Sequence, residues 1–188
     1  MDFNQKIEFL YKSIEDTQST IRAVDIKVGF MFVVIFLPIT AMSNILTVGN
    51  GLITISHCYW WIITLITVLW GISLYLLFKT IVSISNPSER IDGEKPNGMF
   101  YGASLFSLSK ADCFFNLPIK SAKNITDYAN KMPTSEEELY KELIFEKMKL
   151  IYIRDIKIHR SSLLFKVTFF WLLLGSISWA TYLFLKVN

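Results

Sequence analysis

The sequence predicts a mainly all-α membrane protein, in which three transmembrane helices cross the bilayer and two of them extend into a small cytoplasmic helical domain. Three observations predict this class: long uncharged apolar runs, an uneven distribution of lysine and arginine, and helical apolar periodicity beside the first and last runs. The 188 residues are 52% hydrophobic, only slightly above the soluble average, so the placement of the apolar residues decides the class.

Three runs of the chain contain no Asp, Glu, Lys or Arg. A helix rises about 1.5 Å per residue, so about 20 residues cross a hydrocarbon core of about 30 Å. The runs are Val28–Thr47 with 20 residues, Cys58–Phe78 with 21 and Val167–Leu185 with 19. Buried helices of soluble proteins usually keep a polar stripe, whereas these runs carry charge on no face. We therefore predict transmembrane helices at 28–47, 58–83 and 163–186.

Lysine and arginine are concentrated on one predicted side of the bilayer. The loop 49–57 between the first two spans has none, whereas the segment 85–160 has twelve. Because positive charge stays on the cytoplasmic side, we expect the N-terminus and the central segment inside and the C-terminus outside. Trp60 and Trp61 fit an aromatic belt at the outer interface.

Residues 1–27 are predicted to form a cytoplasmic amphipathic helix before the first span. Its inward positions alternate at spacings of four and three, a heptad pattern over about three repeats. These positions are Phe3, Ile7, Leu10, Ile14, Thr17, Ile21 and Val24. The stripe needs a partner, which is the central domain of the same chain, a neighbouring subunit or the membrane surface. We favour packing within one chain.

The segment 84–160 is the predicted cytoplasmic domain. It contains an aromatic cluster at 99–102, which forms either a short strand or a packed turn. Thr134 followed by Glu137 predicts a capping box. The helix that starts there should reach about Arg160 and continue into the third span without a breaker. The first and third spans are therefore expected to be the ends of two long helices.

The chain has no catalytic signature. It lacks a Gly-rich phosphate loop, an HExxH pair and a GxSxG motif, and no plausible nucleophile lies near His57 or His159. Two cysteines and two histidines give no metal signature. We expect no enzymatic activity, no metal and no cofactor. The expected partners are the lipid bilayer and further copies of the chain, and no nucleic acid.

Charged residues gather beside the first and third spans. Before the third span lies a basic segment of Arg154, Lys157, His159 and Arg160. These residues either hold the helix end at the anionic cytoplasmic leaflet or bind an anionic ligand. Before the first span lies a collar of Arg22, Asp25 and Lys27. Its acid is either neutralised locally by Lys27 or paired with the basic segment.

Polar and small residues fall on defined faces of the second and third spans. They are Thr64, Thr67 and Gly71 on the second span, and Ser176 and Ala180 on the third. Such positions usually mark close helix packing. Because hydroxyls without charges line a pore poorly, we predict packing rather than a pore. Pro38 in the first span should kink the helix or free a carbonyl.

In order and spacing, nearly the whole chain resembles the Pycsar effector transmembrane family. The resemblance lies in the Arg22-x-x-Asp25-x-Lys27 collar, two closely spaced spans, the Asn86-Pro87 exit, the Phe100-Tyr101-Gly102 cluster and a long helix over 136–160 that feeds the last span. Val28 stands where the family usually has alanine, which leaves a sister group of three-span defence effectors open.

The resemblance implies an antiphage effector of the bacterial inner membrane, with its C-terminus in the periplasm. Its ligand would be a cyclic pyrimidine mononucleotide, and binding would change helix packing or the state of a homo-oligomer and so impair the membrane. Phosphate chemistry then suits Arg154, Lys157 or Arg160, and the base could stack on Phe100 or Tyr101. Two other classes stay open: a membrane anchor or adaptor that recruits a soluble partner, and an oligomeric channel gated by another signal.

Overall fold

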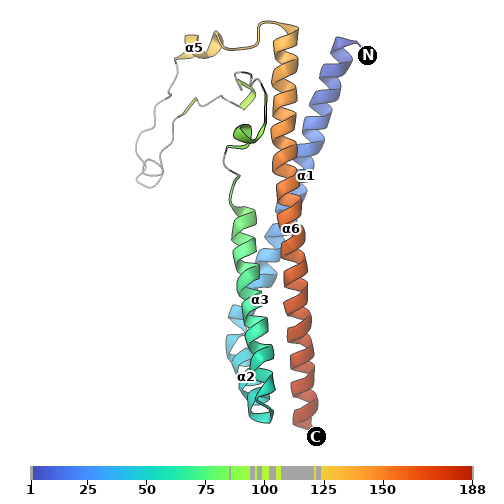
Figure 1. Cartoon of the computed structure of the whole chain (residues 1–188), viewed down its shortest axis with the longest axis vertical. Helices are drawn as coiled ribbons and strands as arrows, with labels where there is room; N and C mark the ends of the chain where they lie inside the picture. The colour runs from blue at the N-terminus through green and yellow to red at the C-terminus, as the bar shows by residue number, and fades with distance from the viewer. Residues whose placement is uncertain are drawn as a thin grey trace. The chain divides into compact units, whose positions relative to one another are not determined.

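The chain is an all-α membrane protein with three helices that are long and apolar enough to cross a bilayer (Figure 1). The computed structural model describes residues 2–84, 86–93, 96, 99–101, 105–106, 121 and 124–187. Within these residues the regular structure is helical, apart from an isolated antiparallel bridge between Phe106 and Ser121.

Two helices are much longer than a bilayer is thick. Helix α1 (Phe3–Thr40) has 38 residues and α6 (Glu136–Val187) has 52, which correspond to about 57 and about 78 Å. The predicted amphipathic helix 1–27 is therefore continuous with the first span, and the predicted third span 163–186 is the end of a helix that begins at Glu136. The expectation of two long helices is confirmed.

The first predicted span, 28–47, is divided. Helix α1 ends at Thr40, and α2 (Met42–Ile55) begins after Ala41, so most of the predicted loop 49–57 is helical. Helix α3 (Cys58–Ile81) then follows, close to the predicted span 58–83. The correction arises because no charged residue occurs between Lys27 and Lys79. Charge therefore could not mark where one helix stops and the next begins.

Pro38 lies in the last turn of α1. Its ring removes a backbone donor and crowds the preceding turn, and the helix stops two residues later. The Trp70 indole N–H of α3 donates to the carbonyl oxygen of Ile35 at 2.8 Å. The carbonyl that Pro38 leaves without its helical donor is that of Val34, four residues earlier, so the prediction that Pro38 frees a carbonyl stays a prediction.

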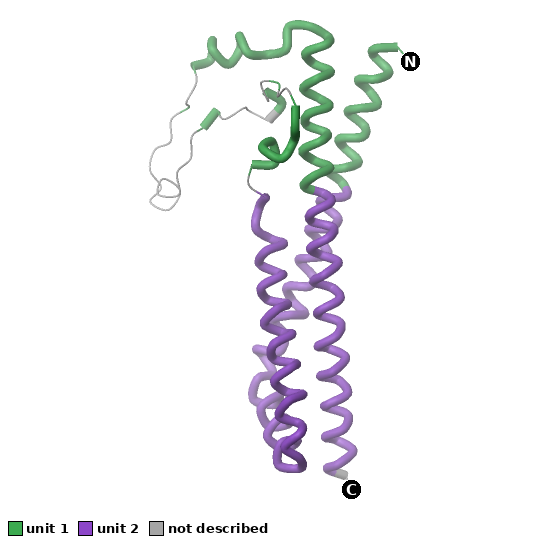
Figure 2. The backbone as a smooth tube through the Cα atoms, viewed as in Figure 1, with its two compact units in different colours: residues 1–19, 86–153 green, residues 20–85, 154–188 purple. Residues whose placement is uncertain are grey.

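The chain forms two compact units (Figure 2). Unit 1 comprises Met1–Ser19 and Asn86–Ile153, and unit 2 comprises Thr20–Ser85 and Arg154–Asn188. Unit 1 also contains the short helices η1 (Pro87–Arg90), η2 (Met99–Tyr101) and α5 (Ile125–Ala129). Both α1 and α6 contribute residues to each unit.

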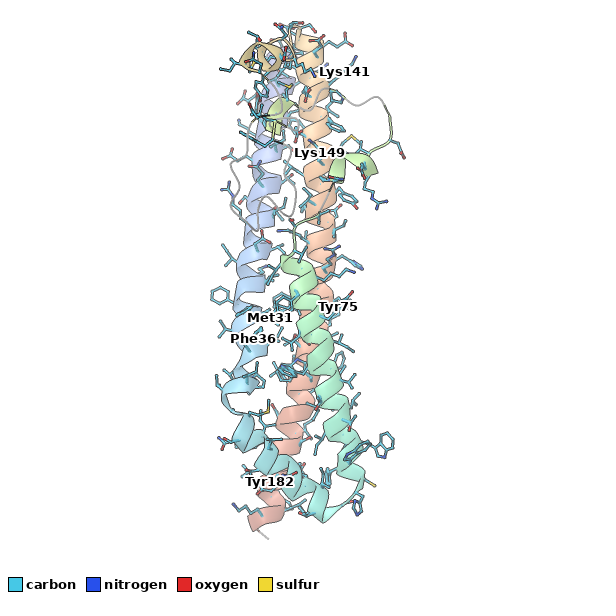
Figure 3. All side chains as sticks on the ribbon, turned by 90° about the vertical axis from the view of Figure 1, so that its left-hand side faces the viewer. Met31, Phe36, Tyr75, Lys141, Lys149 and Tyr182 are labelled. Carbon is cyan, nitrogen blue, oxygen red and sulfur yellow. The ribbon has the colours of Figure 1, made fainter. Side chains whose placement is uncertain are left out.

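Three helices share the core of unit 2. Its buried residues are Val24, Val28, Met31 and Ile35 of α1, Leu77 of α3 and Leu164 of α6. The α1 residues continue the four-and-three spacing of the N-terminal stripe, so one face of α1 is buried along its length. Figure 3 labels Met31 and Phe36, of which Phe36 packs against this core. The Thr168 hydroxyl donates to Ser73 Oγ at 3.4 Å and joins α6 to α3.

In unit 1 the N-terminal stripe packs against α6. Leu10, Ile14 and Thr17 are buried. The rings of Phe3 and Tyr140 lie 6.5 Å apart, with α1 and α6 running in the same direction. The expectation that the stripe packs within one chain is confirmed for these residues.

The cap of α6 lies one residue later than predicted. The Ser135 hydroxyl accepts from the Glu138 amide at 3.2 Å, and Glu138 Oε2 accepts from the Thr134 amide at 2.7 Å. The box is therefore Ser135 with Glu138, and the assignment of Thr134 with Glu137 is wrong. The physical reason is that a capping side chain must belong to the residue just before the first helical one, and α6 begins at Glu136.

Candidate functional site

Nearly all the charge of unit 2 lies beside the ends of its uncharged apolar runs. It comes from seven basic residues, Arg22, Lys27, Lys79, Arg154, Lys157, Arg160 and Lys166, and two acids, Asp25 and Asp155, which give a net charge of +5. The remaining charged residue of the unit is Lys186, near the end of α6. We call this set of nine residues the basic belt. Its excess of positive charge favours binding of an anion.

An ion pair in the belt joins the two long helices. Lys157 Nζ of α6 lies 2.5 Å from Oδ1 and 2.8 Å from Oδ2 of Asp25 on α1. The lysine side chain is 15% exposed and the aspartate side chain 49%. Of the two partners considered for Asp25, the basic segment of α6 is therefore the one that binds it.

The other two predicted ligand-binding bases also have partners. Arg160 Nη1 donates to the Lys79 carbonyl oxygen at 2.9 Å. Since α3 ends at Ile81, that oxygen belongs to the last turn, whose carbonyls have no partner within the helix. Arg160 thus caps α3 from another helix. Arg154 pairs with the adjacent Asp155, with Nη2 at 2.8 Å from Oδ1.

The predicted aromatic residues belong to the other unit. Phe100 lies in η2, a turn rather than a strand, and its ring centroid is 6.4 Å from that of Tyr11. The Tyr101 side chain lies outside the described part of the chain. Phe100 belongs to unit 1 and the three bases belong to unit 2.

Buried polar contacts hold η2 in place. The Met99 amide donates to Glu142 Oε1 of α6 at 3.3 Å, and the Tyr128 hydroxyl donates to the Met99 carbonyl oxygen at 3.4 Å. Glu142 is 4% exposed. A carboxylate on α6 therefore fixes the backbone beside the predicted aromatic cluster.

Sequence reasoning missed the buried acids of α6. Glu146, 1% exposed, forms an ion pair with Lys149, whose ammonium also lies 4.7 Å from the Phe145 ring centroid (Figure 3 labels Lys149). Burial raises the pKa of the Glu146 carboxyl, and the Lys149 ammonium opposes part of that rise. One available signal was the spacing of four that places Glu142 and Glu146 in line with Leu150 on the buried stripe.

No protein-family model, curated protein or solved structure matches this chain. The basis for a function is then its own architecture and chemistry, together with the resemblance noted above.

The small and polar residues predicted for helix packing do not form the contact between helices of one chain. Thr67, Gly71, Ser176 and Ala180 are exposed, and Thr64 is half-buried. A Cβ added at Gly71 would meet nothing within 4 Å. The Thr64 and Thr67 hydroxyls donate to the carbonyls of their own helix, at 2.8 and 2.9 Å.

A different face of the same helices makes that contact. Its most buried members are Ser73, Leu77 and Thr80 of α3, and Leu164, Thr168 and Trp171 of α6. Small residues are required only where two backbones approach closely. In this core the small residues at the contact are Ser73, Thr80 and Thr168, and leucine and tryptophan side chains fill the space beside them.

A shallow hollow lies where α1 and α6 begin. Phe3, Lys6, Glu136, Glu137 and Tyr140 line it, and its volume is about 280 Å³. Its charged lining has both signs, so it selects neither anions nor cations. The basic belt is therefore the better candidate for a ligand site.

Proposed function

We propose that the chain is a membrane effector of an antiphage defence system. Its cytoplasmic domain senses a cyclic pyrimidine mononucleotide, and the rearrangement of a homo-oligomer then impairs the bacterial inner membrane. The continuity of α1 and α6 carries the proposal, because each is one helix with residues in both units. The resemblance to the Pycsar effector transmembrane family supplies the ligand class.

Continuous helices suit a protein that passes a signal to a bilayer. A helix without a break resists bending, so a displacement at one end is carried along its axis. A ligand changes such an equilibrium only when it binds one state more tightly than the other. The basic belt gives an anion a place to act on both helices at once, because it includes residues of α1 and α6.

The belt also supports the orientation. Positive residues at the ends of spans favour the cytoplasmic side, which assigns unit 1 to the cytoplasm and the end of α6 to the periplasm. A cyclic mononucleotide carries a single negative charge on its phosphodiester. Lys157, Arg154 and Arg160, which all belong to unit 2, are the proposed partners of that phosphate.

Reconstitution tests the function directly. The purified chain is placed in vesicles of bacterial phospholipid with an imposed K⁺ potential and a voltage-sensitive dye. We expect cyclic UMP or cyclic CMP, present on both sides, to collapse the potential, while cyclic AMP and cyclic GMP do not. If none of the four nucleotides causes depolarisation, the effector proposal is wrong, and the membrane-anchor class is favoured.

Two proline variants test the role of helix continuity. Ser162→Pro interrupts α6 between the basic segment and the span, at an exposed position, and an interior proline costs about 3 kcal/mol of helix stability. Glu136→Pro places the same residue at the first helical position, where proline is tolerated. We expect S162P to bind nucleotide without depolarising the vesicles and E136P to do both. Equal depolarisation by the two variants would contradict this role.

A further inference from the structure

The ion pair between Asp25 and Lys157 occupies the group that an incoming phosphate needs. We propose that the ligand phosphate and the Asp25 carboxylate compete for Lys157, so that ligand binding and release of α1 from α6 are one event. This inference rests on the proposed function and gives its regulation.

The geometry sets the two occupants in competition. Both carboxylate oxygens of Asp25 lie within hydrogen-bond distance of Lys157 Nζ, at 2.5 and 2.8 Å. An ammonium has three N–H donors, and the lysine side chain is only 15% exposed. A phosphate that accepts from the same donors must therefore displace Asp25. The half-exposed aspartate side chain can leave into solvent.

The charges suit an exchange. A cyclic phosphodiester and an aspartate each carry one negative charge, so the substitution leaves the net charge around Lys157 unchanged. The freed carboxylate remains two residues from Lys27 on the same helix. Desolvating a new charge is the usual obstacle to binding at a partly buried lysine, and here a charge is already present.

Lys157 differs from the other bases of its segment. Arg154 pairs with its neighbour Asp155 on the same helix, and Arg160 caps α3. Lys157 reaches α1, 132 residues away in the chain. The buried core that follows along α1 and α6 is apolar, with Val28 and Leu164 among its members. Such contacts have little directionality, so loss of the ion pair leaves the two helices freer to turn against each other.

Two single substitutions separate the two roles of the pair. Asp25→Asn removes the competitor and keeps the lysine, so we expect nucleotide affinity to rise about tenfold, within the usual range of coupling between sites, and the vesicles to leak without nucleotide. Lys157→Gln removes both the pair and the phosphate partner. We expect it to leak without nucleotide and to bind nucleotide at least about tenfold more weakly.

Charge exchange tests the pair itself. Vesicles that contain Asp25→Lys or Lys157→Asp should each depolarise without nucleotide. The double variant restores the ion pair, so its vesicles should keep their potential until nucleotide is added, as a pairwise interaction requires. Glu8→Gln is the matched control, because Glu8 is an acid of the same helix that pairs with Lys12 within α1 at 2.7 Å. E8Q should behave as the wild type. Binding is measured by calorimetry, and thermal unfolding identifies variants that do not fold.

The outcomes distinguish the two proposals. If the wild type responds to a cyclic pyrimidine nucleotide while D25N has unchanged affinity and no leak, competition for Lys157 is wrong and the effector function stands. If the wild type responds to no nucleotide, the effector function is wrong. A double charge-exchange variant that leaks as much as either single variant also overturns the competition.

Discussion

At the scale of single residues, the unusual feature is charge buried inside unit 1. Glu142 and Glu146 lie on the buried side of α6, with Lys149 beside the second of them. Removing a carboxylate from water is unfavourable unless hydrogen bonds or an opposite charge compensate. The Met99 amide compensates Glu142 and the Lys149 ammonium compensates Glu146. The bond between Met99 and Glu142 defines where η2 and α6 meet, which purely apolar packing would define less precisely.

Glu146 should make the stability of unit 1 depend on pH. Burial raises its pKa above the ordinary value of 4.5, so between pH 4.5 and the raised value the folded protein binds more protons than the unfolded chain. The free energy of unfolding therefore decreases as the pH rises through this window. We expect Glu146→Gln to remove this part of the slope, measured by chemical denaturation in detergent at a series of pH values.

Glu8→Gln is the control for that measurement. Glu8 is exposed, and its hydrogen bond and attraction to Lys12 lower its pKa, so its contribution to the slope has the opposite sign. If E146Q and the wild type show the same dependence on pH, the buried carboxyl does not titrate as described.

At the scale of elements, the additional helix α2 alters the first crossing. Helix α2 lies against α6 at Gly51, where an added Cβ would overlap the Tyr182 ring. It also lies near α3, because a Cβ at Gly49 would be 3.6 Å from Ile63 Cδ1. Both glycines fall in the segment that the sequence suggested as a loop. In the structure they allow helices to approach closely, which is the role of small residues in membrane proteins.

Gly51→Ala should destabilise the spans. Alanine in place of glycine normally stabilises a helix by about 1 kcal/mol, but overpacking against Tyr182 costs about 1–3 kcal/mol. We expect a net loss, measured as a lower thermal unfolding midpoint in detergent. Gly71→Ala, at an open position of α3, is the control and should unfold at the same or a higher temperature.

A second substitution identifies the cause. Tyr182→Leu introduced into the G51A variant shortens the facing side chain and should restore most of the lost stability. If G51A and G71A change the midpoint equally, α2 and α6 are not in close contact.

At the scale of the whole molecule, α1 and α6 enter both compact units and α3 belongs to one. Unit 1 has buried polar contacts, and unit 2 has an apolar core shared by three helices. The proposed orientation follows from the basic belt and predicts which ends of the chain lie on each side of the membrane.

Cysteine labelling tests the orientation. Cys58 is exposed at the start of α3, and Cys113 lies in the central segment, outside the described residues. In right-side-out spheroplasts, we expect an impermeant maleimide to label the C113S variant, which keeps Cys58. The C58S variant should be labelled only after permeabilisation. The reverse pattern would show that the belt lies on the outer side.

The extent of sequence-based prediction differs between features. Three crossings were predictable because uncharged length is a local property that can be counted along the chain. The two long helices were predictable because no breaker separates the heptad stripe or the capped helix from its span. The break at Ala41 and helix α2 were not, since an apolar helix–turn–helix and one apolar helix with a loop have similar composition. The capping box was displaced because Thr134 and Ser135 are both good caps.

In the candidate site, too, some features were predictable from the sequence and others were not. The collar and the basic segment were recognisable as charge beside spans, and pairing of Asp25 with that segment was one of two alternatives. The structure decided that Lys157 is its partner and that Arg160 caps α3. Residues chosen for small size, such as Gly71, proved to lie on the exposed side of α3. When a helix is apolar on all sides, its own sequence does not show which side packs against the neighbouring helices.

The sequence by itself therefore determined the class of the protein, the number of its spans and the positions of its charges, because each depends on residues close together in the chain. Tertiary structure alone decided which face of each span is buried, which acids are enclosed and which basic residues have partners. The physical reason is distance along the chain. Asp25 and Lys157 are 132 residues apart, and only the packing of α1 beside α6 brings their charges together.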